Sequence, residues 1–181
     1  FKSHPLRLYR LGVPMSFATT DLCDQFEHEI HTGQIQILPP VLKHYGGQNT
    51  FFGQAVTLKV FEDNSLIKQI LETENGTGKI LVIDGGASLR CALVGGNLAN
   101  AAVKNGWAGI IVDGAVRDLN EMQPLPIGIM ALALNPLRAV KRNTGVRDLS
   151  VQIQGVRVHP NDWIYVDVDG ALISSQALIN S

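Results

Sequence analysis

Cysteine and charge are both scarce in this chain of 181 residues. Its two cysteines, Cys23 and Cys91, are too few for a disulfide scaffold and lack C-x-x-C spacing, so we expect a reducing, cytoplasmic environment. Charged residues make up 17% of the chain, below the roughly 25% of a typical soluble domain, which favours burial of surface between subunits. Because the formal net charge is −1, we expect no direct binding to nucleic acid or to an anionic membrane.

Long apolar runs are also missing, since none approaches the roughly 18 residues of a membrane-spanning helix. Residues 1–14 contain basic but no acidic side chains, and they lack an apolar core long enough for a secretory signal. We expect this segment to be an N-terminal extension or a cloning remnant, with Met15 as the natural start. The remaining residues, 15–181, have room for one domain with a sizeable core.

The centre of the chain predicts a βαβ unit. Residues 80–83 and 109–112 form two near-continuous apolar runs, each closed by an Asp-Gly pair, Asp84–Gly85 and Asp113–Gly114. Such runs are typical of strands buried on both faces. Between them, the alanine-rich segment 97–105 favours a short helix. The two glycine turns would lie at the carboxyl ends of parallel strands, where open α/β sheets place their ligands.

The flanking segments alternate between strand and helix patterns. Leu22, Phe26 and Ile30 predict an amphipathic helix over residues 17–31, with a Thr or Asp as its N-cap. The other predicted elements are strands over 35–38, 52–61, 127–134, 163–166 and 171–173, helices over 66–71 and from 119, a turn at 45–47, and a hairpin of 151–154 with 156–158. Because no linker-like stretch separates them, we expect a single α/β domain with a mixed sheet around the central βαβ unit.

Two polar clusters have more than one interpretation. Glu62 and Asp63 come directly after a predicted strand, where they can cap the next helix or face a ligand. Arg138, Lys141 and Arg142 lie together in a stretch without a strand or helix pattern. That stretch can be a solvated loop or an anion site, and the sequence alone leaves both open.

The pair Arg117-Asp118, just after the second strand of the βαβ unit, carries the clearest chemical signal. A guanidinium can hold a carboxylate through two parallel hydrogen bonds, and a neighbouring carboxylate can hold a hard divalent cation that keeps water and substrate as its other ligands. This combination suits an α-keto acid, because the cation would polarise the keto oxygen and stabilise an enolate. An ordinary surface Arg beside a helix-capping Asp is the alternative.

Gly95 and Gly96, before the predicted helix, do not form a dinucleotide fingerprint, because no G-x-G-x-x-G follows the first strand. They would leave a bare helix N-terminus, whose free N–H groups suit a carboxylate or phosphate. A structural turn explains the same two glycines equally well.

Several motifs, in order, resemble those of the regulator of ribonuclease activity A (RraA) family, which also contains class II 4-hydroxy-4-methyl-2-oxoglutarate aldolases and oxaloacetate decarboxylases. The resemblance covers nearly everything after Met15, and the motifs are Thr20-Asp21-Leu22-Cys23-Asp24, Tyr45-Gly46-Gly47, Phe61-Glu62-Asp63-Asn64, Val82-Ile83-Asp84-Gly85-Gly86, Gly106-Trp107-Ala108-Gly109, Val116-Arg117-Asp118, Asp162-Trp163-Ile164-Tyr165-Val166-Asp167 and Asp169-Gly170. The resemblance implies a swivelling β/β/α-type fold and a ring-shaped homotrimer, in which trimers can pair further, with the site at the subunit boundary.

The resemblance also implies roles for individual residues. In enzymatic members, a Gly-Asp-Asn-Leu segment and the Arg of Arg-Asp bind substrate, and the Asp of that pair holds the divalent metal, Mg²⁺ or Mn²⁺. Carried over, the substrate-binding residues are Gly95, Gly96, Asn97, Leu98 and Arg117, the metal ligand is Asp118, and the catalytic residues are Arg117 and Asp118. One position departs from the family pattern Asp-x20-Arg-Asp, because Gly96 stands where that pattern has its first Asp. A step that needs this carboxylate would be weakened.

Two functions therefore compete. The first is a divalent-metal-dependent lyase that cleaves 4-hydroxy-4-methyl-2-oxoglutarate to pyruvate and decarboxylates oxaloacetate through a shared pyruvate enolate. The second is a protein inhibitor of ribonuclease E, which would modulate RNA decay by binding that enzyme and not its RNA. Arg117 and Asp118 favour the lyase, whereas Gly96 favours the inhibitor. On balance we expect the lyase.

Overall fold

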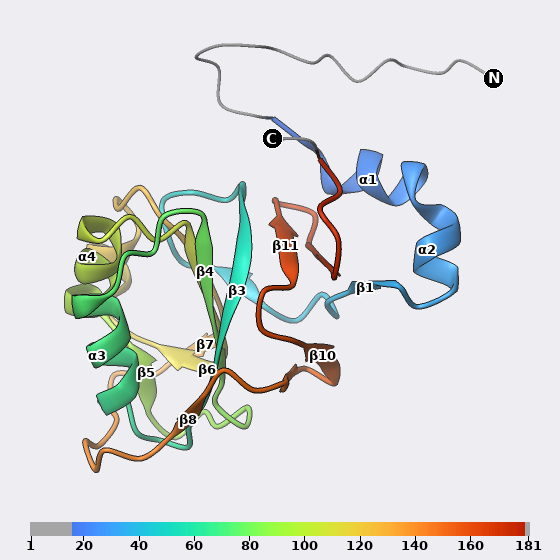
Figure 1. The fold of residues 1–181 in the computed structure, drawn as a ribbon. Helices are drawn as coiled ribbons and strands as arrows, with labels where there is room; N and C mark the ends of the chain where they lie inside the picture. The colour runs from blue at the N-terminus through green and yellow to red at the C-terminus, as the bar shows by residue number, and fades with distance from the viewer. Residues whose placement is uncertain (1–15, 180–181) are drawn as a thin grey trace.

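A computed structural model describes residues 16–179 (Figure 1), so the predicted extension over 1–14 lies outside the described residues. The helices are α1 (Thr19–Gln25), α2 (Glu27–His31), α3 (Ser65–Thr73), α4 (Gly96–Lys104) and α5 (Leu119–Met122). The strands are β1 (Ile35–Ile37), β2 (Lys43–His44), β3 (Phe51–Lys59), β4 (Lys79–Asp84), β5 (Ala92–Val94), β6 (Gly109–Val116), β7 (Gly128–Leu134), β8 (Val146–Arg147), β9 (Val151–Ile153), β10 (Val156–Val158), β11 (Trp163–Val166) and β12 (Ala171–Ser174). No helix within residues 16–179 is long and apolar enough to cross a membrane.

One large mixed sheet organises the chain, with the strand order β1-β12-β11-β3-β4-β6-β7-β2. Its centre, β3-β4-β6-β7, is parallel, and the outer strands pair antiparallel. The predicted βαβ unit is confirmed as β4, α4 and β6. One predicted turn is wrong, because β6 continues through Asp113–Gly114 to Val116, with a register shift against β7 at this point. The strand therefore ends directly before Arg117.

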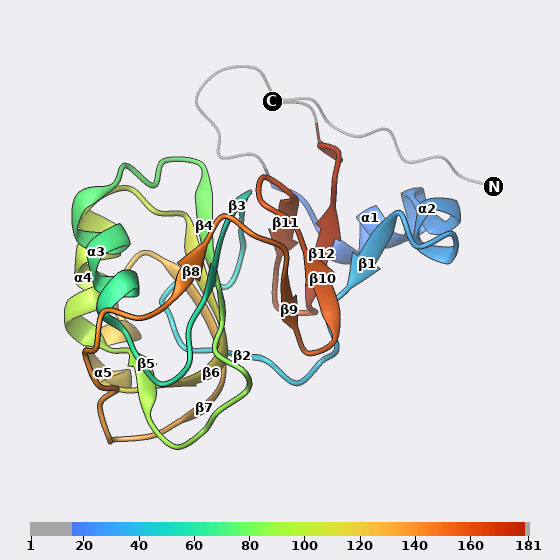
Figure 2. The ribbon, with the colours of Figure 1, turned by 60° about the horizontal axis from the view of Figure 1, so that its bottom comes forward.

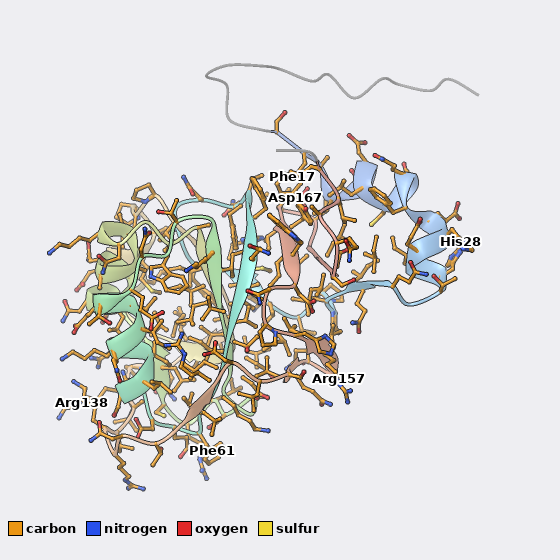
Figure 3. All side chains as sticks on the ribbon, viewed as in Figure 1. Phe17, His28, Phe61, Arg138, Arg157 and Asp167 are labelled. Carbon is orange, nitrogen blue, oxygen red and sulfur yellow. The ribbon has the colours of Figure 1, made fainter. Side chains whose placement is uncertain are left out.

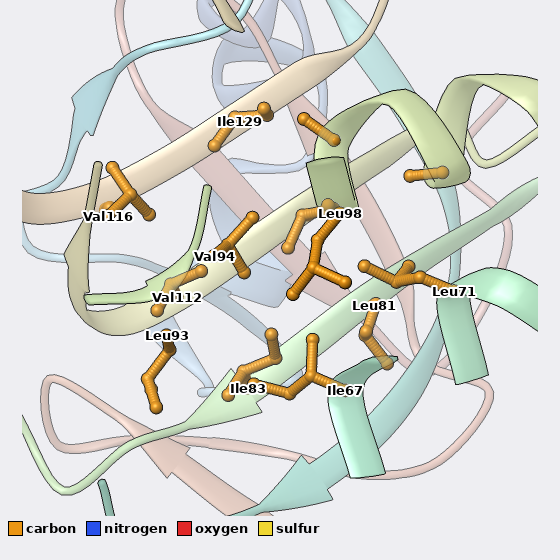
Figure 4. Close-up of a cluster of buried hydrophobic side chains, with 14 of the residues drawn as sticks. Ile67, Leu71, Leu81, Ile83, Leu93, Val94, Leu98, Val112, Val116 and Ile129 are labelled. Atoms are coloured by element: carbon orange, nitrogen blue, oxygen red, sulfur yellow. The ribbon is translucent and has the colours of Figure 1, made fainter. Parts of the chain in front are cut away.

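Two helices cover one face of the parallel strands. In Figures 1 and 2, α3 and α4 lie on the same side of β3, β4 and β6. Their inward side chains, among them Ile67, Leu71 and Leu98, share an apolar cluster with Leu81 and Ile83 of β4 (Figure 4). Since apolar burial contributes about 25 cal/mol per Å², this cluster fixes both helices on the sheet. It thereby fixes the first turn of α4 relative to the end of β6.

The hairpin β9–β10 covers the other face. It pairs with itself, as predicted, and forms a two-stranded sheet apart from the large one. Val151 and Ile153 of the hairpin pack with Ile80 and Val82 of β4 in a second apolar cluster. Figure 2 shows the hairpin on the side of the sheet away from α3 and α4. The parallel strands are thus covered on both faces, which explains their continuous apolar runs.

The N-terminal helix differs from its prediction. The predicted helix over 17–31 is divided at Phe26 into α1 and α2, and its N-cap, Ala18, has no side-chain cap. Thr19 instead donates both its N–H and its hydroxyl to the Asp167 carboxylate, each at 2.7 Å. Figure 3 shows Phe17 beside Asp167 at this junction. The helix start is therefore held by the end of β11, a partner that is distant in the sequence.

Candidate active site

Arg117 and Asp118 form the turn between β6 and α5. Asp118 adopts the left-handed conformation, with φ 63° and ψ 47°, which few residues other than glycine adopt. It is the N-cap residue of α5, but its side chain does not cap that helix. Its Oδ2 instead accepts a hydrogen bond of 3.0 Å from the Gly96 N–H at the start of α4. The turn therefore aims the carboxylate at the neighbouring helix.

Gly95 and Gly96 allow the start of α4 to approach this turn closely. An added Cβ at Gly95 would lie 2.6 Å from Oδ2 of Asp118 and 3.1 Å from Cγ of Arg117. An added Cβ at Gly96 would overlap the Glu121 carboxylate and lie 2.9 Å from the Glu121 Cβ. A side chain at either position would therefore require the Asp118 or the Glu121 side chain to move.

A cavity of about 250 Å³ opens beside the turn. The predicted site residues that line it are Gly95, Asn97, Leu98, Arg117 and Asp118. Gly96 does not line the cavity, but it is joined to the site through its hydrogen bond to Asp118. The structure thus brings the predicted residues together, at the carboxyl end of β6 and the amino end of α4.

Four charged side chains on the cavity wall were not among the predicted site residues. Lys68 and Glu72 come from α3, and Arg138 and Lys141 come from the segment after β7. Lys68 and Glu72 are spaced i, i+4 on one helix face, with 3.9 Å between Nζ and Oε1. This spacing in the sequence could have predicted an exposed helix face, but not a cavity. Figure 3 shows Arg138 at the outer edge of the molecule.

The anion-site interpretation of the basic cluster gains support from this arrangement. Arg138 and Lys141 line the cavity together with Lys68 and Arg117, whereas Arg142 does not. Four cationic side chains therefore face Asp118 and Glu72, the two acidic residues of the lining. The excess of positive charge suits an anionic ligand.

Asp63 holds the segment that carries Arg138 and Lys141. Its carboxylate, in a residue that is 1% exposed, accepts hydrogen bonds from the Arg142 N–H at 2.7 Å and the Thr144 hydroxyl at 3.1 Å. It also accepts one from the Ser65 N–H at 2.8 Å. Burial by itself would raise the pKa of this carboxyl, but the hydrogen bonds outweigh it and lower the pKa of Asp63 to about 2.

Of the two acids after β3, Asp63 has the predicted capping role and Glu62 does not. Asp63 binds the N–H of Ser65, the first residue of α3. Glu62 does not cap this helix, because it accepts a hydrogen bond of 2.7 Å from the Ser88 hydroxyl and pairs with Arg90. The Arg90 hydrogen bond lowers the pKa of the Glu62 carboxyl. Glu62 also does not line the cavity.

The two Asp-Gly pairs of the βαβ unit do not join Arg117. Asp84 and Asp113 line a separate cavity of about 670 Å³ on the side of the β9–β10 hairpin. Both carboxylates are buried and already accept hydrogen bonds from the hairpin, Asp84 from the Gln152 N–H and Asp113 from the Gln154 side chain. Their observed role is to hold the hairpin on the sheet.

The donor set at Asp118 fits a magnesium- or manganese-type cation. Within residues 16–179, no three His, Cys, Asp or Glu side chains come together as a metal cluster. Mg²⁺ is commonly held by one or two carboxylates and keeps several waters, so one accessible carboxylate suffices. The Asp118 side chain is 36% exposed. Its Oδ2 is engaged by Gly96, whereas no hydrogen bond within the described chain reaches its Oδ1.

Comparison with known proteins places the chain in a family. A family model named RraA-like and described as Aldolase/RraA matches residues 19–173, so the chain belongs to the RraA-like family. A Burkholderia mallei protein, provisionally named as a 4-hydroxy-4-methyl-2-oxoglutarate aldolase, is 53% identical over 165 residues, which cover 91% of this chain and 99% of that protein. The resemblance stated from the motifs is confirmed.

Two solved structures confirm the fold. The RNA-processing inhibitor RraA from Thermus thermophilis is 44% identical with a TM-score of 0.83, over 90% of this chain and 94% of that one. A Geobacillus kaustophilus structure, titled S-adenosylmethionine:2-dimethylmenaquinone methyltransferase, is 38% identical with a TM-score of 0.83, over 91% of this chain and all of that one. The predicted RraA-like α/β fold with its mixed sheet is therefore correct.

The Asp63 contacts predict a stability difference that depends on pH. The folded pKa of about 2 lies below the ordinary value for Asp, so the ionised carboxylate stabilises the fold above about pH 4, and this contribution is lost as the pH falls towards 2. We expect Asp63→Asn to lower the free energy of unfolding by about 1–3 kcal/mol at pH 7. The difference from wild type should shrink between about pH 4 and pH 2.

Urea unfolding at a series of pH values measures this difference. Asp24→Asn, at an exposed acid of α1, is the control and should leave stability within about 0.5 kcal/mol of wild type. A destabilisation by Asp63→Asn that stays constant down to pH 2 would contradict the assigned pKa.

Proposed function

We propose that this protein is a divalent-metal-dependent lyase of α-keto acids, which cleaves 4-hydroxy-4-methyl-2-oxoglutarate to pyruvate and decarboxylates oxaloacetate. The observation that carries the proposal is the placement of Arg117 and Asp118 together at a cavity lined by the bare first turn of α4 and by further cations. The 53% identical relative with an aldolase name supports the same reaction class.

Arg117 is placed to hold the substrate carboxylate. Its Nε lies 3.7 Å from Oδ2 of Asp118, and one Nη donates to the Pro136 carbonyl at 3.3 Å. The side chain is 37% exposed, so its other donors can form paired hydrogen bonds with a carboxylate. The contacts to Asp118 and Pro136 orient the guanidinium, and the Pro136 contact uses only one of its five donors.

The start of α4 supplies a second anion-binding element. A helix leaves its first N–H groups without intrahelical acceptors, and the helix dipole adds partial positive charge there. Asp118 takes the N–H of Gly96, and the following residues, Asn97 and Leu98, line the cavity. Their N–H groups can therefore receive an oxygen of the keto acid.

Asp118 is the residue that would hold the divalent cation, Mg²⁺ or Mn²⁺. When bound, the cation supplies Lewis-acid stabilisation of the negative charge that develops on the keto oxygen. The protein residues fix the substrate against that charge: Arg117 holds the carboxylate next to the keto group, and the α4 N-terminus orients it. In each substrate the bond that breaks joins C3, the carbon beside the keto group, to C4, so its electron pair can be delocalised onto the keto oxygen.

The same arrangement serves both proposed substrates. In oxaloacetate, the bond between C3 and its carboxylate breaks, CO₂ leaves, and the electron pair remains as the enolate of pyruvate, which then takes up a proton. In 4-hydroxy-4-methyl-2-oxoglutarate, the hydroxyl gives its proton to water, the C3–C4 bond breaks, and one pyruvate leaves as the ketone. The other forms as the same enolate, which takes up a proton from water. A common enolate explains how one site can perform a retro-aldol cleavage and a decarboxylation.

The exposed apolar side chains at this end of the sheet support self-association. Large ones are Phe61, Leu89, Leu134, Leu137, Val140 and Val146. We infer that other copies of the chain cover part of this surface in the homotrimer that the family resemblance implies, which would complete the site at the subunit boundary. A low fraction of charged residues agrees with such burial.

The central prediction concerns Asp118. Wild type should release pyruvate from both substrates only with Mg²⁺ or Mn²⁺, in an assay coupled to lactate dehydrogenase. Asp118→Ala should lower kcat/KM by about 100-fold or more, because the cation loses its protein ligand.

Asp148→Ala is a matched control for this variant. Asp148 also follows an arginine and is also left-handed, with φ 58°, but its Arg147 is bound by Glu74 and neither lines the cavity. This control should retain wild-type kcat/KM. Absence of metal-dependent pyruvate in wild type would overturn the lyase proposal, and full activity of Asp118→Ala would show that the site is misplaced.

A second prediction tests the cations across the cavity. Both proposed substrates carry two carboxylates, and Lys141 and Arg138 are placed to receive the one that Arg117 does not hold. We expect Lys141→Ala to raise the KM for oxaloacetate by about 10–150-fold, since a hydrogen bond to a charged group contributes about 1.5–3 kcal/mol, with a smaller change in kcat. Arg142→Ala, outside the cavity lining, is the control. An unchanged KM in Lys141→Ala would remove this residue from substrate binding.

The second candidate function is inhibition of ribonuclease E through a protein contact. The observation that favours it is the 44% identity to a structure titled as an RNA-processing inhibitor. The exposed apolar side chains around Phe61 and Leu137 offer a surface for such a contact. The function would need neither Asp118 nor a cation.

A pull-down with nuclease-treated ribonuclease E tests this candidate. If it is correct, wild type retains the enzyme, Leu137→Glu loses it, and Val168→Glu, at an exposed apolar residue of the β11–β12 turn, retains it. Failure of wild type to retain ribonuclease E would eliminate the candidate, whatever the result of the pyruvate assay.

A further inference from the structure

Glu121, an exposed acid in the first turn of α5, lies beside the start of α4, although it does not line the cavity itself. With Asp118 as the N-cap, Glu121 occupies the third helical position, where a glutamate ordinarily reaches back to the N-cap N–H. The structure shows no side-chain cap for α5. Within residues 16–179, no hydrogen bond or ion pair involves the Glu121 carboxylate. Its charge is favourable in the first turn of α5, but the carboxylate has no bound partner there.

The carboxylate instead covers the α-carbon of Gly96. A Cβ at position 96 would overlap Oε2 of Glu121, and the Cδ and Cβ of Glu121 would lie 2.8 and 2.9 Å away. Since real Cβ atoms do not approach other atoms this closely, any side chain at position 96 requires Glu121 to move. Gly96 and Glu121 thus occupy one space between them, and only one of them can place a side chain there.

The same turn of α4 carries the hydrogen bond to Asp118. Gly96 donates its N–H to Oδ2 of Asp118 and lies under the carboxylate of Glu121. Two carboxylates from the β6–α5 turn therefore flank one helix N-terminus, whose free N–H groups and dipole favour negative charge. Position 96 is also where the family pattern has an Asp. This chain has Gly96 instead, and the carboxylate of Glu121 lies where the side chain of that Asp would begin.

We propose that Glu121 is the second carboxylate of the site, which raises the affinity for the divalent cation at Asp118 and replaces the acid that position 96 does not supply. This inference rests on the proposed metal-dependent function. Asp118 remains the ligand, and Glu121 is a positioning residue that acts through the added negative charge. A supporting carboxylate of this kind contributes about 10–100-fold in metal affinity.

Mn²⁺ binding to the full chain without substrate tests the proposal, with free Mn²⁺ measured by electron paramagnetic resonance. Glu121→Gln keeps the size of the side chain and removes its charge, and it should weaken Mn²⁺ binding by about 10–100-fold. The double variant Gly96→Asp with Glu121→Ala moves the acid from one residue to the other and should restore the affinity to within about threefold of wild type. Glu27→Gln, at an exposed acid of α2, should bind Mn²⁺ as wild type does.

A thermal unfolding control separates charge from packing. Glu121→Gln should unfold at the wild-type temperature, whereas Gly96→Asp alone should unfold at a lower temperature because its Cβ collides with Glu121. If Glu121→Gln binds Mn²⁺ as tightly as wild type while Asp118→Asn loses binding, the inference is overturned. Failure of the double variant to regain affinity, although folded, overturns the claim that the acid has exchanged positions.

The outcomes also separate this inference from the lyase proposal. If wild type releases pyruvate and Glu121→Gln matches it in kcat/KM and in Mn²⁺ affinity, only the role of Glu121 fails. If wild type releases no pyruvate but Glu121→Gln weakens Mn²⁺ binding as expected, the lyase fails and the two-carboxylate cation site stands. If wild type binds no Mn²⁺, both fail.

Discussion

The hydrogen bond between the Gly96 N–H and the Asp118 carboxylate is the contact on which the candidate site depends. It joins the end of β6 to the start of α4, two points separated by 22 residues in the chain. The bond can form because both elements are fixed on the same sheet, β6 as a strand buried along its whole length and α4 through its apolar face. A glycine at position 95 is also required, since a methyl group there would meet the carboxylate.

The left-handed turn at Asp118 shows how this contact is obtained. A non-glycine residue in this conformation costs free energy, of order 1–3 kcal/mol, and surrounding contacts must hold it. Asp148 has the same conformation and also follows an arginine, but its neighbour Arg147 is bound to Glu74 on the side of β8. One dipeptide therefore serves two purposes in the same chain. The two aspartates differ in what their carboxylates bind, which is the Gly96 N–H at the start of α4 for Asp118 and the neighbouring Arg147 guanidinium for Asp148.

The central part of the fold could be predicted from sequence because its signals are local. The apolar runs of β4 and β6 and the alanines of α4 each reveal their element, and the placement of Arg117 and Asp118 after a strand follows from them. The path of β6 through Asp113–Gly114 could not be predicted, because the Asp-Gly pair indicates a turn and only the pairing with β7 overrides it. The two-residue strands β2 and β8 are too short to show a period at all.

The charged residues on the other wall of the cavity could not be assigned to the site from the sequence, for a different reason. Lys68 on α3 and Lys141 after β7 lie more than seventy residues apart. They converge because the Asp63 carboxylate and a backbone bridge to Val140 tie the later segment to the β3–α3 turn. No spacing rule connects them. The family resemblance identified Arg117, Asp118 and the segment 95–98, but Glu121 became visible only through its overlap with position 96.

The hydrogen bonds of the Asp63 carboxylate to residues 142 and 144 form an anchor, which fixes the segment that carries Arg138 and Lys141. In the proposed function, the turn after β6 would present the groups that bind the cation, and the anchored segment would present the charges that meet the remote end of the ligand. Because the anchor is made through backbone N–H groups of residues 142 and 144 and the Thr144 hydroxyl, side chains at positions 138 and 141 can change without disturbing it. Under the proposed function, substitutions at positions 138 and 141 could therefore change which acid is accepted without a change at Arg117 and Asp118.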